Sequence, residues 1–175
     1  HKDNRLIKYL AKHKHKSPFN HAFATFHVKA PVFVARQLVK HEYMPWNEIS
    51  RRYVDEEPEL YEAPVWRGRS ADKKQGSSGE VRSNANVHYF NNNALQMYKQ
   101  LLDEGVAPEQ ARMVLPQSMM TEWYWSGTLH AFAKMCGLRL KPDAQYETRL
   151  VAERIEEKIM ELFPVSWEAL RMYED

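Results

Sequence analysis

Cysteine is almost absent from this chain of 175 residues, which contains only Cys136. A single cysteine excludes a disulfide within the chain and a zinc site built from several cysteines. It is typical of a reducing compartment, so we expect a cytoplasmic location. Apolar stretches of membrane-spanning length are also missing, and the first residues are charged and not signal-like. We therefore expect no membrane partner.

An excess of one charge sign is missing too. The chain has 25 Lys and Arg residues against 23 Asp and Glu residues, for a net charge of +2. That balance argues against a general nucleic-acid binder, whose affinity comes mainly from phosphate contacts. No Gly-x-Gly-x-x-Gly pattern or P-loop is present, which argues against a Rossmann or Walker phosphate site. Ser50 lacks the Gly-x-Ser-x-Gly setting of a hydrolase nucleophile.

The remaining composition indicates one globular domain, residues 1–175, with 43% hydrophobic and 12% aromatic residues. The segments 119–125 and 131–138 are rich in Met, Trp and Phe. Ordinary core and a subunit interface both fit that composition. Cys136 lies on an apolar helix face, so we expect it to pack in the core and not to act as a nucleophile.

Hydrophobic spacing predicts a mixed α+β chain. Helices are expected at 3–14, 32–41, 82–104, 108–115, 128–138 and 143–163, and extended segments at 21–30 and 121–125. Pro31 can open the second helix. Residues 56–79, which include SADKKQGSSG, predict a long exposed loop, and both a functional lid and a plain linker fit it.

The segment 37–53, QLVKHEYMPWNEISRRY, concentrates polar groups at a helix end and the following loop. The helical pattern breaks at Met44, before Pro45, so we expect a loop and then a short strand at 52–55. Gln37, Lys40 and His41 share one helix face. Such groups can converge on an anion, so we interpret the segment as a nucleotide-phosphate site.

Glu48, Ser50 and Arg52 alternate, so on an extended backbone they would point the same way. An acceptor, a hydroxyl and a guanidinium on one face suit a uracil-like ring edge and a phosphate. Arg52 taken alone would more simply form a surface salt bridge. His13, His15 and His21 lack an acidic partner at ligand spacing, so we predict no metal site.

The segment 37–53 and three other segments of the sequence resemble the flavin-dependent thymidylate synthases. That family's motif runs Arg-His-Arg, seven residues, then Ser, and here Lys40, His41 and Glu42 precede seven residues and Ser50. Three further blocks match in order: HKSPFNHAFATFHVKAPVFVARQ, ARMVLPQSMMTEWYW and LRLKPDAQYETR. The family's first strand has no counterpart, so the resemblance implies that the chain begins inside the family's domain.

The resemblance implies an α+β fold with mixed helices packed on a small antiparallel sheet. It also implies a homotetramer with active sites at subunit interfaces. Such enzymes bind FAD and convert dUMP to dTMP, with 5,10-methylenetetrahydrofolate as carbon donor and NADPH as reductant. The reduced flavin carries the methylene and hydride chemistry, so no cysteine nucleophile is needed.

Carried over by position, the dUMP site would comprise Gln37, Glu48, Ser50, Arg52, Arg112 and Arg139. The FAD site would comprise His15, Ser17, Asn20, Lys40, His41, Glu42, Thr128, His130 and Lys134. Arg139, Ser50 and His15 are the expected catalytic residues. Ser50 fits a substrate-binding hydroxyl better than a nucleophile because no neighbouring base is evident. A histidine beside the flavin would orient it or shuttle a proton.

The motif departs from the family's pattern at two positions. Lys40 keeps a positive charge but lacks the planar fork of arginine. Glu42 reverses the charge, and Lys134 and His130 are candidates to restore it. Two other functions stay open: a nucleotide-binding or RNA-binding module without chemistry, and a flavoprotein that has lost synthase activity.

Overall fold

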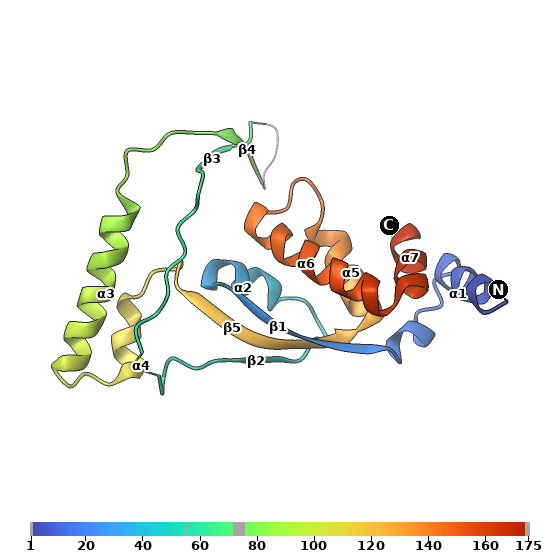
Figure 1. Cartoon of the computed structure of the whole chain (residues 1–175), viewed down its shortest axis with the longest axis horizontal. Helices are drawn as coiled ribbons and strands as arrows, with labels where there is room; N and C mark the ends of the chain where they lie inside the picture. Colours follow the sequence, from blue (N-terminus) through green and yellow to red (C-terminus); the bar gives the residue numbers. More distant parts are fainter. Residues whose placement is uncertain (1, 55, 72–75, 174–175) are drawn as a thin grey trace.

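A three-stranded antiparallel sheet forms the centre of the computed structural model, which describes residues 2–54, 56–71 and 76–173. Its strands are β1 (Phe23–Pro31), β5 (Met120–Thr128) and β2 (Trp46–Glu48), in the order β1-β5-β2. The long pair runs from Phe23 opposite Thr128 to Pro31 opposite Met120. This sheet with its helices confirms the expected α+β class (Figure 1).

Alternation along the strands gives the sheet one buried and one polar face. Phe26 lies opposite Trp125 and Val28 lies opposite Trp123 on the buried face. The other face carries polar pairs. His27 contacts Glu122 at 2.7 Å, and the hydroxyl groups of Thr25 and Ser126 are 2.8 Å apart.

Helices cover the apolar face of the sheet (Figure 1). They are α2 (Val32–Leu38), α5 (Leu129–Arg139), α6 (Tyr146–Leu162) and α7 (Pro164–Met172), with α1 (Lys2–Lys12) packed on α7. Pro31 ends β1 and caps α2 in an extended conformation, as expected for proline at that boundary. Helix α7 was not predicted, because Pro164 reads equally well as the end of a helix and as the first residue of the next.

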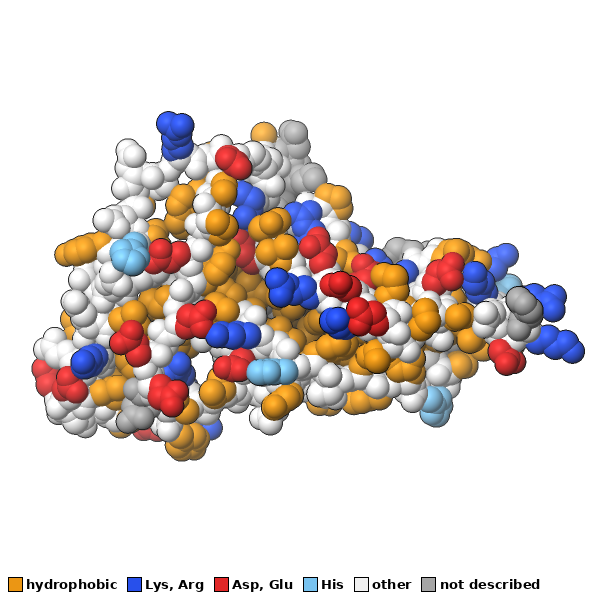
Figure 2. Space-filling model, in the orientation of Figure 1, with side chains coloured by type: hydrophobic (Ala, Val, Ile, Leu, Met, Phe, Trp, Pro, Cys, Tyr) orange, Lys and Arg blue, Asp and Glu red, His pale blue; other side chains and the backbone are white. Residues whose placement is uncertain are grey.

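One end of the molecule is formed by α3 (Val87–Asp103), α4 (Pro108–Ala111) and the 3-10 turn η2 (Arg112–Val114), and the other end by α1 (Figure 1). Helix α3 begins later than the predicted residue 82 because the Asn86 side chain caps it, accepting from the Tyr89 N–H at 3.0 Å. Figure 2 shows hydrophobic side chains across the middle of one face and Lys and Arg side chains at the α1 end.

The predicted long loop at 56–79 contains a hairpin, so that expectation was wrong in part. Strand β3 (Arg67–Arg69) pairs with β4 (Ser77–Glu80), and Leu60 forms a β-bridge with Met119. Residues 72–75, the DKKQ of the SADKKQGSSG run, lie outside the described part of the chain. A hairpin was not evident because the Ser and Gly residues of β4 are weak strand formers.

The predicted strand at 52–55 was wrong, although Asp55 lies outside the described residues. The chain turns at Ser50 instead: its carbonyl accepts from the Tyr53 N–H at 3.4 Å and its hydroxyl from the Arg52 N–H at 3.3 Å. A serine hydroxyl that binds the backbone two residues on favours such a turn. Glu48, Ser50 and Arg52 therefore do not lie along one extended strand.

Helix α6 packs one apolar face against the core. Its buried positions recur at Thr148, Ala152, Ile155 and Ile159, the spacing of one helix face. We expect Ile159→Ala to lower the free energy of unfolding by about 2–5 kcal/mol, because Ile159 is fully buried. Urea titration followed by circular dichroism measures the change.

The matched control is Leu162→Ala on the same helix, where the side chain is 63% exposed. That substitution should change the free energy of unfolding by about 0.5 kcal/mol or less. Equal losses in the two variants would contradict the packing described for α6.

Candidate functional site

The loop after α2 packs against the sheet through Met44 and Pro45. Met44 is buried, and a Cβ at Gly127 of β5 would lie 3.1 Å from its terminal methyl group. The carbonyl of Pro45 accepts from the Ser126 N–H at 3.0 Å. Tyr43 has a positive φ of 60°, which turns the chain between the end of α2 and β2. This places Lys40, His41 and Glu42 beside the start of α5.

The N-terminus of α5 is tied to the short helix η1 (Ser17–Asn20). The Thr128 hydroxyl accepts from the Ala131 N–H at 3.1 Å, which caps the helix, and donates to Asn20 at 3.0 Å. Three segments distant in sequence therefore meet here: η1, the loop after α2 and the first turns of α5.

Seven of the nine residues predicted for FAD line one cavity of about 530 Å³. They are Asn20, Lys40, His41, Glu42, Thr128, His130 and Lys134. An eighth, His15, lines a neighbouring cavity of about 430 Å³ that shares His41, His130 and Lys134 with the first. The ninth, Ser17, begins η1 and is exposed, outside both sets of lining residues.

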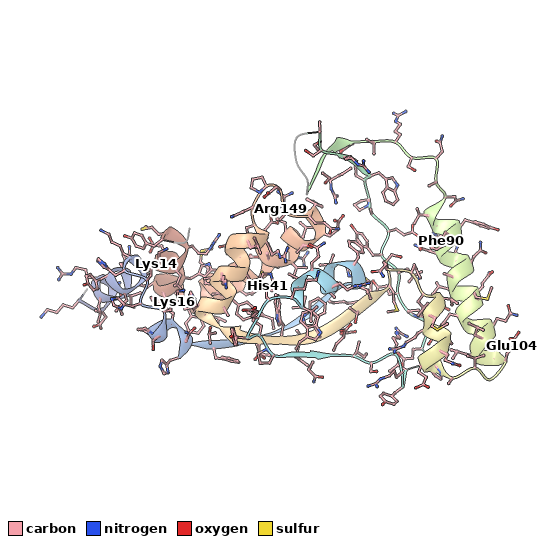
Figure 3. All side chains as sticks on the ribbon, turned by 180° about the vertical axis from the view of Figure 1, so that it is seen from behind. Lys14, Lys16, His41, Phe90, Glu104 and Arg149 are labelled. Carbon is pink, nitrogen blue, oxygen red and sulfur yellow. The ribbon has the colours of Figure 1, made fainter. Side chains whose placement is uncertain are left out.

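Both cavities are rich in positive charge. Lys14, Lys16 and Lys141 line the second cavity together with the shared Lys134, while Glu42 is the acidic residue of the first. Apolar residues such as Phe19 and Leu170 form part of the second cavity's wall. Figure 3 shows Lys14 and Lys16 toward the α1 end and His41 near the middle of the molecule. The donor set suits an anionic ligand that also carries an apolar ring.

His41 is held neutral where the two cavities meet. Burial is the largest cause that lowers its pKa from 6.5 to about 4, and the charges of Arg139 and Lys134 contribute to the same shift. The Arg139 Nε–H donates to His41 Nε2 at 3.0 Å, which requires that ring nitrogen to be unprotonated. At neutral pH, His41 is therefore a hydrogen-bonding group and not a cation. Burial and the charges of Lys16 and Lys134 also lower the pKa of His130.

A third cavity, of about 350 Å³, lies beside His41 and contains Gln37 and Arg139. Arg139 donates from Nη2 to the Gln37 carbonyl at 3.1 Å, so the end of α5 is fixed to α2. Lys40, Gly76, Ala144 and Gln145 complete the lining. Two of the six residues predicted for dUMP thus meet within one chain.

The other four predicted dUMP residues lie elsewhere. Glu48 on β2 accepts from the Thr121 hydroxyl at 2.7 Å, and the Ser50 hydroxyl accepts from Arg52 Nε at 3.2 Å in the turn after β2. Arg112 lies in η2, where its Nε donates to the Glu109 carbonyl at 3.2 Å. A single chain does not bring these residues to Gln37 and Arg139.

Several residues around the site were missed in the sequence. The Gln145 side chain accepts from Gln37 and donates to Glu147. Lys14, Lys16 and Lys141 add charge to the second cavity. Gln145 and Glu147 fall inside the LRLKPDAQYETR block, but nothing in their local pattern indicates their partners. The lysines are indistinguishable in sequence from ordinary surface charge.

Within residues 2–54, 56–71 and 76–173, no three His, Cys, Asp or Glu residues are grouped as metal ligands would be. Among the described helices, none has the length and apolarity needed to span a membrane.

Comparisons with known proteins give a consistent result. A model of the family described as thymidylate synthase complementing protein matches residues 1–165. A flavin-dependent thymidylate synthase of Thermus thermophilus is 42% identical over 170 residues, which cover 95% of this chain and 63% of the relative. The Thermotoga neapolitana enzyme of the same name is 37% identical over 173 residues, covering 98% of this chain and 77% of the relative. The chain thus spans less than two thirds of the Thermus relative's length.

Solved structures agree with the sequence relatives. A UMP/dUMP methylase, PolB from Streptomyces cacaoi, bound with 5-Br dUMP, is similar with a TM-score of 0.84 and 31% identity. The match covers 97% of this chain and 79% of that one. The same protein bound with 5-Br UMP gives a TM-score of 0.87, with 97% and 83% covered.

The neutral state of His41 can be measured directly. We expect its ring resonances in an NMR pH titration to move near pH 4, because burial and two neighbouring cations oppose protonation. The unfolded chain takes up this proton nearer pH 6.5, so folding stability should fall as the pH drops from about 6.5 to about 4.

Arg139→Ala should raise the pKa of His41, since it removes both a neighbouring charge and part of the burial. Lys99→Ala, on α3, serves as the control and should leave the titration unchanged. A wild-type titration centred near pH 6.5 would contradict the hydrogen bond from Arg139.

Proposed function

The chain belongs to the thymidylate synthase complementing protein family, whose curated members are named flavin-dependent thymidylate synthases, and on that premise we propose that it converts dUMP to dTMP. FAD is the proposed cofactor, 5,10-methylenetetrahydrofolate the carbon donor, NADPH the reductant and the cytoplasm the location. The observation that supports this most is the gathering of eight predicted flavin residues around two adjoining cavities beside Gln37 and Arg139.

The residues of the two cavities fit FAD. Lys40, Lys134 and the lysines of the second cavity supply charge for its pyrophosphate, and the apolar wall suits a planar ring. When bound, the flavin supplies the redox chemistry of the reaction. His41 would orient it by hydrogen bonding, since a pKa of about 4 makes this histidine a poor proton carrier at neutral pH.

Gln37 and Arg139 are proposed to hold the pyrimidine of dUMP. An amide and a guanidinium that bind the ring carbonyls would stabilise negative charge on the oxygens and so favour the enolate form of the ring, in which C5 can attack an electrophilic carbon. Arg52 and Arg112 are proposed to bind the phosphate, and Ser50 to bind as a hydroxyl. Glu48 already accepts from Thr121, so it is proposed to bind through its remaining acceptor capacity.

We propose that the complete site forms between subunits of a homotetramer. The segment after β2, which contains Arg52, and η2, which contains Arg112, both contact α3, at the end of the molecule away from α5 and its last residue, Arg139 (Figure 1). Exposed apolar side chains on α3, among them Phe90 at 59% exposure, support burial against another copy. Arg52 and Arg112 of one subunit would then lie close to Arg139 of another at the interface between them.

Glu42 supports a second candidate, a flavoprotein without synthase activity. It lines the first cavity and reverses the charge expected in the motif. Against this stands the position of Lys134 in the same cavity, which supports its proposed role in restoring the lost charge. His130 lines the cavity too, but its lowered pKa leaves it neutral at neutral pH, so it would add hydrogen bonding and not charge.

Tritium release from 5-tritiated dUMP separates the two candidates. With FAD, NADPH and methylenetetrahydrofolate present, we expect folate-dependent release together with dTMP, because C5 exchanges its hydrogen for the new carbon. Protein that binds flavin yet releases no tritium would favour the inactive flavoprotein.

The FAD content of the purified protein tests whether Lys134 compensates for the negative charge of Glu42. Measured by absorbance, the FAD content should fall in Lys134→Ala and stay unchanged in the control Lys99→Ala. Equal content in the two variants would count against the compensation.

Mixing two inactive variants tests the composite site. Arg52→Ala and Arg139→Ala should each lose activity, and their mixture, unfolded and refolded together, should recover about a quarter of the wild-type rate, because random pairing leaves that share of sites intact. The dTMP-forming assay measures the recovery.

The matched control mixes Gln37→Ala with Arg139→Ala. These residues are in contact within one chain, so every site built from such a mixture lacks one of them. Recovery in this control, or none in the first mixture, would refute a site in which Arg52 and Arg139 come from different subunits.

A further inference from the structure

The Gln37 side chain is the end of a hydrogen-bond chain that reaches α6 and the β3–β4 hairpin. It accepts from the Thr148 hydroxyl at 3.3 Å and donates from Nε2 to Gln145 Oε1. Gln145 donates to Glu147 Oε2 at 3.2 Å. The other oxygen of Glu147 accepts from Arg67 Nη2 at 2.6 Å. None of these side chains reaches the flavin cavities.

Glu147 fixes the donor-to-acceptor direction of this series of hydrogen bonds. A glutamine amide both donates and accepts, so two amides alone allow either orientation, but an ionised carboxylate only accepts. Burial raises the pKa of Glu147, yet the hydrogen bonds from Arg67, its own backbone and Gln145 outweigh burial and lower the pKa on balance. Gln145 must therefore turn its NH₂ group toward Glu147, which leaves its carbonyl to accept from Gln37.

The orientation of Gln37 matters because it lines the cavity with Arg139. Beyond its two bonds within the protein, the amide keeps one N–H and one carbonyl lone pair. Uracil presents an acceptor at O4 beside a donor at N3, and cytosine presents the reverse. An amide held in one orientation complements only one of these two edges.

We propose that Glu147, acting through Gln145, is a positioning residue that locks the Gln37 amide and thereby makes the pocket selective for uracil over cytosine. The inference rests on the proposed function, since it takes Gln37 as a pyrimidine-binding residue. Glu147 is suited to the task because only 9% of its side chain is exposed and Arg67 holds its second oxygen.

Calorimetric titration of dUMP and dCMP into the FAD-loaded protein tests the lock. Wild type should prefer dUMP. In Glu147→Gln, the new amide both donates and accepts, so Gln37 is free to turn over and the ratio of the two dissociation constants should fall about tenfold or more. Gln145→Met should have the same effect while leaving the Arg67–Glu147 pair intact, so it keeps the test valid if Glu147→Gln fails to fold.

Two further variants separate orientation from general damage. Arg67→Met breaks the same ion pair and loosens the hairpin, but it leaves an acceptor-only carboxylate at 147, so the dUMP preference should persist. The exchanged pair, Gln145→Glu with Glu147→Gln, keeps the net charge and sets an acceptor-only group directly beside Gln37. This double variant should recover the preference that Glu147→Gln loses.

The outcomes distinguish the lock from the function on which it rests. Wild-type protein that binds no dUMP would overturn both. Wild type that prefers dUMP, with variants at 145 and 147 that keep that preference, would overturn the lock and leave the proposed function standing. Equal loss of preference in Arg67→Met would also overturn it, because hairpin position and not amide orientation would then control selectivity.

Discussion

The packing of Trp123 and Trp125 on the covered face of β5 is the constraint on which the rest of the molecule depends. Trp46 of β2 stacks on Trp123 with ring centroids 4.2 Å apart, and Phe132 of α5 meets Trp125 edge-on at 5.6 Å. In the described part of the chain, neither buried indole N–H has a hydrogen-bond partner. Leaving such a donor unpaired costs about 1–3 kcal/mol each. The packing of these rings offsets that cost, because it joins both edge strands and the covering helix to one central strand.

This arrangement connects the strand to the chemistry of the site. Helix α5 follows β5 without a loop, so the strand sets where His130, Lys134 and Arg139 lie along the helix. The pairing of β2 with β5 holds the preceding loop and therefore His41. The 3.0 Å contact between Arg139 and His41 then joins the proposed nucleotide and flavin cavities through one guanidinium. A change in either cavity that moves Arg139 must alter the other.

Sequence periodicity predicted most helices and the two long strands, because an apolar stripe of helical or alternating spacing is a local property. It failed at the turn after β2, where the Ser50 hydroxyl accepts a hydrogen bond from the backbone N–H of Arg52. It also failed at the hairpin, because the β4 strand consists mainly of Ser and Gly. The candidate flavin residues were identified from a family motif, and their common cavity is a tertiary result. The bonds of Gln37 to Thr148 and Gln145 span up to 111 positions, so no periodic pattern in the sequence indicates them.

The altered motif shows why a local pattern is a poor measure of a site's electrostatics. A positive field sums over every cation near a cavity, and most of the cations here come from outside the motif: Lys14 and Lys16 between α1 and η1, Lys134 on α5, and Lys141 just after α5. A planar bidentate contact, in contrast, depends on the arginine at its own position. Replacing arginine with Lys40 and Glu42 therefore removes directed hydrogen bonds more than it removes attraction. On our proposal, this chain holds an anionic cofactor by the charge of the whole cavity, with Lys134 placed between its two halves.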